Sequence, residues 1–177
     1  MVFIQHYNSP LGGMLLATDE VGIRGLWFNG QKYFAHNLPA ERTEQNTPAL
    51  SAAKRWLDIY FAGVNPDFLP PLHPVGSSFR REVWNILLQI PYGQTTTYGE
   101  IARQLADKHG LPRMSAQAVG GAVGHNEISV IIPCHRVVGT SGSLTGYAGG
   151  IDKKVKLLEL EHTDMSRFFI PEKGTAL

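Results

Sequence analysis

Near the start of the chain, short runs of β-forming residues alternate with turn signals. The runs cover residues 2–8, 13–18 and 23–28, and the turns between them hold Ser, Pro and Gly at 9–12 and Asp and Gly at 19–22. Short β-rich runs joined by such turns are typical of an antiparallel meander. We therefore predict three neighbouring strands, followed by a polar stretch with little periodicity.

A helix is predicted after this polar stretch. Thr47 can cap it, and Pro48 suits its first position because the N–H that proline lacks would have no partner there. Apolar residues then repeat at helical spacing until Gly63 ends the segment. These residues are Leu50, Ala53, Leu57 and Phe61.

Residues 65–77 contain four prolines and look like an interdomain linker that lies extended over the surface. We place a domain boundary there. Residues 1–77 are then a small α+β scaffold domain that ends in this linker. Residues 78–163 form a second domain, and 164–177 are a C-terminal tail in which two neighbouring phenylalanines suggest docking.

The second domain begins with a helical pattern. One helix is predicted from Ser78, a second from a capping-box sequence at 97–100 through Leu105, and a third over 116–124 with Ser115 as its cap. The last two helices and the turn between them resemble a helix-turn-helix.

A short apolar strand is predicted next at 128–132, then a Gly/Ser/Thr-rich loop at 139–150 and a final helix from 152 to about 161. The predicted fold class is α+β. A small N-terminal α/β-meander domain precedes a mostly helical, winged helix-turn-helix-like domain.

Composition and charge limit the classes of protein to which this chain can belong. The first 77 residues carry five basic and six acidic side chains, and the rest carry eleven and nine, so the net charge of +1 divides into −1 and +2. This balance argues against broad electrostatic coating of nucleic acid but allows a small docking surface. Cys134 is the only cysteine, so no intrachain disulfide can form. With no signal-peptide pattern and no run long enough to span a bilayer, we expect a cytoplasmic protein that does not associate with membranes.

The single cysteine lies in the sequence IIPCHRVVG, residues 131–139. A lone cysteine is usually a buried small hydrophobe. Here Pro133 is expected to end the strand and bring the thiol to its edge. The positive charges of His135 and Arg136 favour the thiolate. Glu161 is a candidate carboxylate to orient His135, although spacing alone does not separate this role from that of a solvated helix residue.

The third predicted helix of the second domain, AQAVGGAVG, has three glycines and no bulky side chain. Tight packing against a neighbour would explain this composition, and so would close approach to nucleic acid. Small side chains suit the narrow minor groove better than base readout in the major groove.

PCHR at 133–136, with AVGGAVGHN before it and GSLTGYAGG after it, resembles the O6-alkylguanine-DNA alkyltransferase family, the methylated-DNA–protein-cysteine methyltransferases. The resemblance covers residues 78–161. It implies a monomer that binds double-stranded DNA through the minor groove and flips the damaged guanine out of the stack. The alkyl group then moves irreversibly to Cys134, with no metal or organic cofactor; O4-alkylthymine is a possible second substrate.

The resemblance also implies residue roles. Cys134 would accept the alkyl group, His135 would deprotonate it through water, Glu161 would orient His135, Asn126 would brace the turn before the active site, and Tyr98 would meet the flipped base. The substrate-binding set is Tyr98, Ser129, Cys134, Val137, Tyr147 and Ala148. The DNA-binding set is Thr97, Tyr98, Ser115, Ala116, Gln117, Ala118, Gly120 and Arg136, the last of which would also lock the motif to neighbouring structure.

Three features depart from the family pattern. Gln117 stands where the family often has an arginine, which predicts weaker DNA affinity and a shallower salt dependence. Glu127 follows Asn126 where proline is common. The zinc-binding cysteines of some members cannot exist here, so no metal site is expected.

Three other functions are each compatible with part of the sequence. A protein that recognises alkylated bases without efficient transfer is the nearest alternative, and Cys134 argues against it. A cysteine hydrolase would leave the DNA-docking segment unexplained. A winged-helix regulator with an incidental thiol would bind a specific sequence in the major groove and would not consume Cys134.

Overall fold

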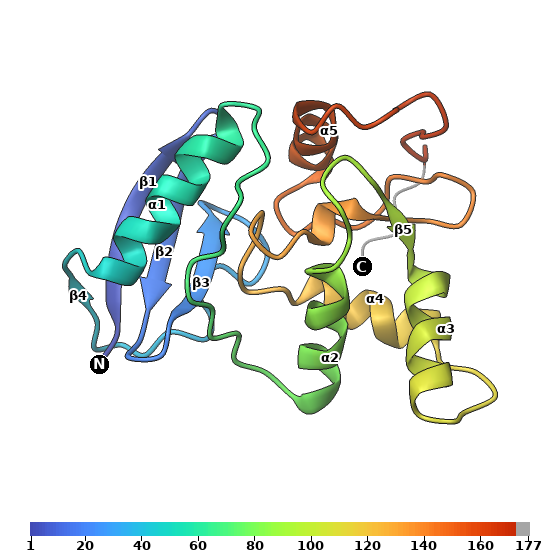
Figure 1. The fold of residues 1–177 in the computed structure, drawn as a ribbon, viewed down its shortest axis with the longest axis horizontal. Coiled ribbons are helices and arrows are strands. Elements are labelled where there is room, and N and C mark those ends of the chain that lie inside the picture. Colours follow the sequence, from blue (N-terminus) through green and yellow to red (C-terminus); the bar gives the residue numbers. More distant parts are fainter. Residues whose placement is uncertain (173–177) are drawn as a thin grey trace. The chain divides into compact units, whose positions relative to one another are not determined.

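The structure is a computed structural model, and it describes residues 1–172. The chain divides into two compact units. Unit 1 comprises Met1–Val75 together with Glu127–Ser129, and unit 2 comprises Gly76–Asn126 and the chain from Val130 onward. Among the described residues no helix is long and apolar enough to cross a membrane. The arrangement of sheet and helices confirms the predicted α+β class (Figure 1).

Unit 1 contains a four-stranded sheet within the described residues, in the order β3-β2-β1-β4. Strands β1 (Phe3–Ser9), β2 (Gly12–Thr18) and β3 (Ile23–Phe28) pair antiparallel, which confirms the predicted meander. Strand β4 (Thr43–Glu44) joins the edge parallel to β1 and was not predicted. Two exposed polar residues give no alternation from which a strand could be recognised.

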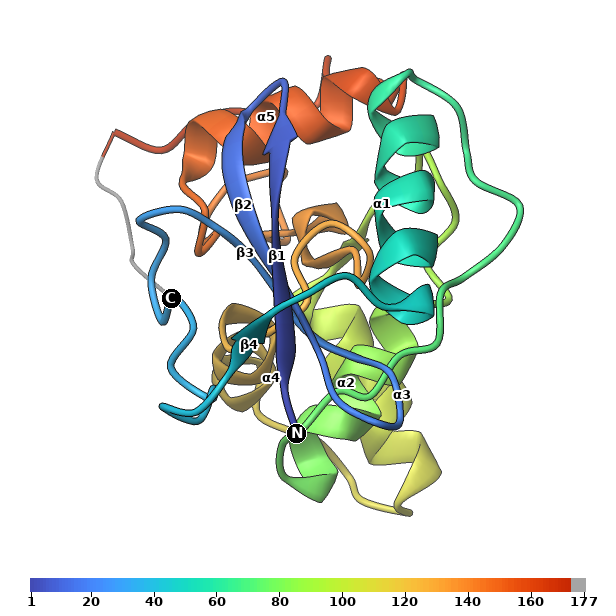
Figure 2. The same ribbon diagram turned by 90° about the vertical axis from the view of Figure 1, so that its left-hand side faces the viewer.

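The helix α1 (Pro48–Phe61) packs on β1, β2 and β3 of this sheet and runs alongside the strands (Figure 2). The Thr47 hydroxyl accepts a hydrogen bond from the backbone N–H of Leu50 at 3.2 Å, as the sequence predicted. The helix buries Trp56 and Tyr60, whose rings stack 5.2 Å apart, more completely than the predicted Phe61. The buried face of α1 is therefore wider than the line of apolar residues predicted from the sequence.

The proline-rich segment is more than a linker. Its Pro71 carbonyl accepts a hydrogen bond from the N–H of Ile23 at 2.7 Å, and the N–H of His73 returns one to the Ile23 carbonyl at 2.7 Å. The His73 ring also lies 2.6 Å from the Asp19 carboxylate. The segment thus adds a bridge at the start of β3, so it is fixed to the sheet and does not simply cross the surface.

Unit 2 contains three closely placed helices, α2 (Ser78–Leu87), α3 (Tyr98–Lys108) and α4 (Ala116–Gly124) (Figure 1). The hydroxyls of Ser77, Thr97 and Ser115 cap them by accepting backbone N–H bonds. Helix α4 packs against α2 and α3, which gives the predicted helix-turn-helix. Strand β5 (Thr96–Thr97) pairs parallel with β6 (Val137–Val138), and α5 (Ile151–Leu160) follows.

The predicted strand at 128–132 is wrong. Ile128 forms one bridge with Leu26, and the chain then turns through Val130, whose φ is +71°. Residues 128–132 are buried, so their apolar run signals burial and not extended pairing. The Asn126 side-chain amide donates to the Ile132 carbonyl at 2.8 Å, and this bond stabilises the turn.

The segment after α5 returns to the loop that follows β6. The N–H of Leu144 donates to the Phe169 carbonyl at 2.8 Å, and the N–H of Phe169 donates to the Gly142 carbonyl at 3.1 Å. The docking suggested by the two phenylalanines is confirmed as far as Phe169. The last five residues of the predicted tail lie outside the described part of the chain.

Thr47→Ala tests the capping of α1. Because the hydroxyl satisfies one N–H of the first turn, the variant should lose about 1 kcal/mol of unfolding free energy, measured by urea denaturation. Thr47→Ser keeps the hydroxyl and should remain close to the wild type. Equal stability of the alanine variant and the wild type would contradict this role.

Candidate active site around Cys134

The chain bends sharply just before the cysteine. Pro133 has φ −82° and ψ 64°, and the N–H of Cys134 donates to the Ile132 carbonyl at 2.8 Å. These values define an inverse γ-turn. Cys134–Arg136 then form one turn of 3-10 helix, η1, before β6 begins. Because successive side chains of a 3-10 turn point about 120° apart, Cys134 and His135 do not face opposite sides as they would in a strand.

The Glu161 carboxylate, at the C-terminal cap of α5, binds both residues that follow the cysteine. His135 Nε2 lies 2.6 Å from Oε2, while Arg136 Nε donates to Oε1 at 2.8 Å and Nη2 donates to Oε2 at 3.0 Å. The N–H of Gly93 also donates to Oε1 at 3.0 Å. Such a bidentate guanidinium–carboxylate pair fixes both distance and orientation.

Arg136 therefore lies inside unit 2. Its Nη1 also donates to the Ile90 carbonyl at 2.7 Å, and only 8% of the residue is exposed. This position fits the predicted locking of the motif to neighbouring structure. It differs from the predicted DNA contact, because the charged group is turned toward Glu161 and the Ile90 carbonyl and not toward the surface.

Burial and hydrogen bonding determine the charge states of Glu161 and His135. Burial alone would raise the pKa of Glu161, but the hydrogen bonds and charges of His135 and Arg136 outweigh it and hold that pKa well below its usual range. Burial lowers the pKa of His135 despite the neighbouring carboxylate. We therefore assign an ionised Glu161 and a neutral His135 that donates its Nε2–H to the carboxylate. Nδ1 is then the basic nitrogen of the ring.

The Cys134 thiol is buried, and burial raises its pKa. A hydrogen bond from the Asn126 side chain, the positive charge of Lys154 and nearby backbone N–H groups lower it again, but by less. The predicted thiolate, stabilised by charges on His135 and Arg136, is thus wrong for the resting protein. His135 is neutral, Glu161 balances the Arg136 charge, and the thiol needs a base before it can attack.

Lys154 is the site residue that the sequence analysis missed. It is fully buried on the inner face of α5, where Nζ donates to the Val137 carbonyl at 2.6 Å and to the Thr145 carbonyl at 2.7 Å. Burial lowers its pKa to about 8, and the nearby Cys134 raises it in part. The available signal was its spacing, because Lys154 occupies the apolar face that Leu157 and Leu158 continue.

Two aromatic residues of the predicted substrate set lie close to this network. The Tyr98 hydroxyl donates to the Thr145 carbonyl at 3.2 Å, the same oxygen that Lys154 binds. The Tyr147 ring meets the His135 ring edge-on at 6.4 Å. Ala148 follows Tyr147 in the same loop and is half-buried, and Val137 contributes its carbonyl through Lys154.

Two predicted residues have other surroundings. Ser129 belongs to unit 1, where its buried hydroxyl donates to the Gln31 side chain at 3.3 Å. Gly120 is buried on the inner side of α4 and does not present its backbone for DNA contact. Spacing in the sequence could not reveal either position.

The outer side of α4 is exposed and carries small residues. Ser115, Ala116, Gln117 and Ala118 are all exposed, and the Ser115 hydroxyl is engaged as the helix cap. Thr97 is half-buried and caps α3 in the same way, 3.1 Å from the N–H of Glu100.

Within the described residues no group of three or more His, Cys, Asp or Glu side chains could hold a metal ion.

A buried thiol beside a histidine–carboxylate pair is the arrangement of a protein that uses cysteine as a nucleophile. Residues 78–163 match the family described as 6-O-methylguanine DNA methyltransferase, DNA binding domain. Residues 2–74 match its ribonuclease-like domain.

Known proteins resemble this chain over most of its length. A methylated-DNA–protein-cysteine methyltransferase of Methanosarcina acetivorans is 46% identical over 156 residues, which are 88% of this chain and 95% of the relative. The crystal structure of the Mycobacterium tuberculosis O6-methylguanine methyltransferase superposes with a TM-score of 0.76 at 43% identity, covering 98% of this chain and 97% of that one. A structure of the Mycobacterium tuberculosis protein in complex with DNA gives 0.77 at 42% identity, with 94% of each chain covered.

The chain belongs to the 6-O-methylguanine DNA methyltransferase family. The predicted family and enzyme class are thereby confirmed, because relatives of this identity and coverage carry that enzyme name.

Lys154→Met tests the charge beside the thiol. Because the ammonium group lowers the pKa of Cys134, its removal should raise the apparent thiol pKa, measured from the pH dependence of alkylation by iodoacetamide. Lys156→Met removes an exposed charge from the same helix and should leave the profile unchanged. An unchanged profile in Lys154→Met would show that the ammonium group does not act on the thiol.

Acid should weaken unit 2 through the buried pair. The folded pKa of Glu161 lies below its unfolded value, so the stability it provides is present above the usual carboxyl range and is lost as pH falls toward the folded pKa. Urea unfolding followed from about pH 6 down to about pH 2 should show this loss, which begins near the unfolded carboxyl range. Glu161→Gln should be less stable at pH 7, by about 3–5 kcal/mol, with a shallower acid dependence. Glu159→Gln, an exposed change on the same helix, should keep the wild-type slope; an equally steep slope in Glu161→Gln would refute the assignment.

Proposed function

We propose that this protein repairs DNA by moving an alkyl group from the O6 atom of guanine to the sulfur of Cys134, once per molecule. The observation that carries the proposal is the buried array of Cys134, His135 and Glu161 in the unit that also holds the helix-turn-helix. The names of the relatives and the DNA complex of a close structural neighbour support it.

The reaction needs a thiolate, and the resting thiol is protonated. In the proposed mechanism His135 accepts the thiol proton at Nδ1, directly or through one water, while ionised Glu161 stabilises the imidazolium that forms. Lys154 and the Asn126 amide stabilise the negative sulfur as it appears. These two groups lower the cost of forming a charge in a buried site.

The sulfur then attacks the alkyl carbon. The S–C bond forms as the C–O6 bond breaks, and the electron pair of that bond stays on the guanine. The proton taken from Cys134 ends on the guanine ring, so the products are neutral guanine and a thioether. Tyr98, which donates to the Thr145 carbonyl in the free protein, would turn its hydroxyl to the base. A thioether is a poor leaving group, so each molecule would act once.

DNA would be held through the minor groove by α4 and the start of α3. A guanine inside the stack is out of reach of a buried thiol, so the base must be flipped out at a cost of a few kcal/mol. The small exposed side chains of α4 permit close approach to a narrow groove, and Gln117 would hydrogen-bond the partner base left behind. The proposed DNA contacts are Thr97, Tyr98, Ser115, Ala116, Gln117 and Ala118.

We also propose that the protein acts as a cytoplasmic monomer without metal or organic cofactor. The proposed displacement uses only a thiol, a base and charge stabilisation, and all three come from this chain. The alternative of lesion recognition without transfer is disfavoured, because it gives no role to a cysteine surrounded by a base, an amide and a cation.

Intact-protein mass after mixing with excess duplex containing O6-methylguanine tests this function. One methylene should be gained on the Cys134 peptide, saturating at one per chain. Cys134→Ala should gain no mass yet bind the duplex, whereas His135→Gln and Glu161→Gln should slow the transfer by about 10²-fold or more. Tight lesion binding without a mass change in the wild type would instead establish a recognition protein.

A further inference from the structure

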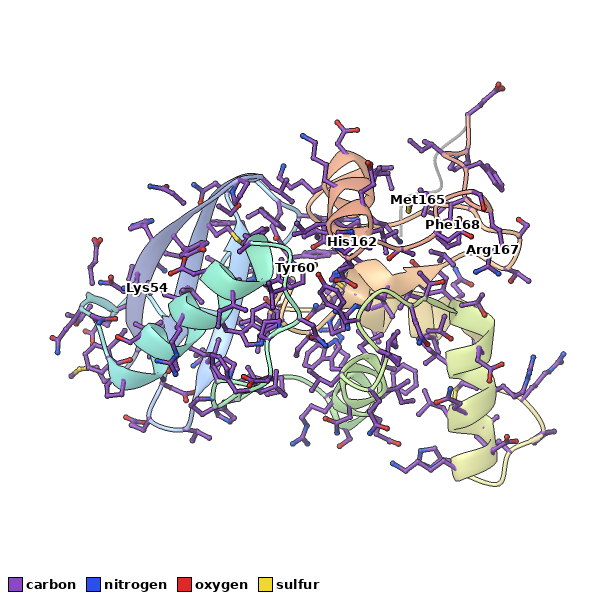
Figure 3. The ribbon with its side chains drawn as sticks, turned by 45° about the horizontal axis from the view of Figure 1, so that its top comes forward. Lys54, Tyr60, His162, Met165, Arg167 and Phe168 are labelled. Carbon is purple, nitrogen blue, oxygen red and sulfur yellow. The ribbon has the colours of Figure 1, made fainter. Side chains whose placement is uncertain are left out.

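The tail after α5 is held against the loop that follows β6. Besides the two backbone hydrogen bonds of Phe169, the side chains of Met165 and Phe168 pack on an apolar cluster of Val138, Leu144 and Leu158. Figure 3 shows Met165, Arg167 and Phe168 close together on this segment. The family match ends at residue 163, so this segment lies beyond it.

Gly142 makes the close approach of the tail possible. Its φ is +89°, a conformation that side chains rarely adopt, and a Cβ atom there would collide with the Arg167 carbonyl oxygen. The backbone of Arg167 is thus held close to Gly142 in the loop after β6, and this fixes the position from which the Arg167 side chain extends.

Arg167 is one of the residues that line a polar cavity of about 340 Å³. Five of the other nine lining residues carry a hydroxyl group, and none of the residues that line the cavity is acidic. The guanidinium also lies 5.8 Å from the centre of the Phe168 ring. The lining residues are Thr95, Thr96, Thr97, Val138, Gly139, Thr140, Ser141, Gly142, Arg167 and Phe168.

This combination of groups favours an anion of phosphate type. A guanidinium offers several N–H donors in a fork that matches phosphate oxygens, and hydroxyls add further donors. Thr97 is also the cap of α3, so the partial positive charge at the start of that helix lies on the same side.

We propose that this cavity binds a backbone phosphate of DNA and that Arg167 is the cation that contacts it, an inference that rests on the proposed function. Two of the three segments that line the cavity lead into the active site: residues 95–97 continue into Tyr98, and residues 138–142 continue toward Thr145 and Tyr147. A nucleotide inserted toward Cys134 therefore brings its own backbone to this edge. Arg167 supplies charge in a protein whose recognition helix carries the neutral Gln117.

The test compares two variants of equal charge. Arg167→Ala and Lys156→Ala each remove one positive charge, and Lys156 is exposed on α5 but does not line the cavity. Duplex binding is measured by fluorescence anisotropy over a range of salt concentrations. For Arg167→Ala the slope of log affinity against log salt should become shallower by about 0.9, the value for one lost phosphate contact.

Lys156→Ala should keep the wild-type slope, and Arg167→Lys should restore it because the charge is retained. A wild-type slope in Arg167→Ala would overturn the proposal, and so would an equal loss in Lys156→Ala, which would indicate overall charge. Protection of the Leu144 and Phe169 amides from hydrogen exchange checks that the tail stays docked in the variant.

Transfer to Cys134 is followed by mass in the same samples. At DNA concentrations well below saturation, Arg167→Ala should transfer the methyl group more slowly than the wild type, in proportion to its weaker binding, whereas Lys156→Ala should match the wild type. Failure of the wild type to transfer at all would overturn the proposed function. Normal transfer with an unchanged salt slope would overturn the phosphate site alone.

Discussion

The Glu161 carboxylate is the charge on which the order of unit 2 depends. It lies out of water and holds an imidazole, a guanidinium and a backbone N–H at once. A buried carboxylate is tolerated only when its partners are well placed, and removal of one partner leaves an uncompensated charge. The pairing therefore fixes η1 against the end of α5, and it fixes the chain around Cys134 in one conformation.

Neutral His135 and protonated Cys134 follow from the same arrangement. Burial lowers the pKa of His135, and the charge of Arg136 adds to this effect, so the carboxylate does not force a proton onto the imidazole. The ring keeps a basic nitrogen for use when substrate is present. The thiol in turn stays unreactive in a closed site, and Lys154 and Asn126 reduce the cost of its ionisation without removing it.

Local signals allowed most of the secondary structure to be predicted. Thr47, Thr97 and Ser115 cap the helices that their positions suggested, because a cap depends on only a few neighbouring residues. The residues at 128–132 were assigned wrongly because an apolar run reports burial, while Val130 and the Asn126 amide impose a turn. The family resemblance named Cys134, His135, Glu161 and Asn126, and the structure brings these four together. The resemblance could not place Ser129 or Gly120, whose neighbours come from distant parts of the chain. Lys154 was missed because a residue on the inner face of α5 fits the ordinary pattern of an amphipathic helix.

Unit 1 is built from two separate parts of the chain, Met1–Val75 and Glu127–Ser129, and this affects the order in which it can fold during synthesis. Glu127 accepts a hydrogen bond from the Trp27 indole at 2.9 Å and lies 3.1 Å from His36, and its carbonyl accepts one from the N–H of Leu26. During synthesis the strands of the sheet, within residues 3–44, are made long before Glu127–Ser129. The β3 edge and the Trp27 indole N–H therefore gain these partners only after α4 has been synthesised, and Asn126, which braces Cys134, is the residue that immediately precedes them.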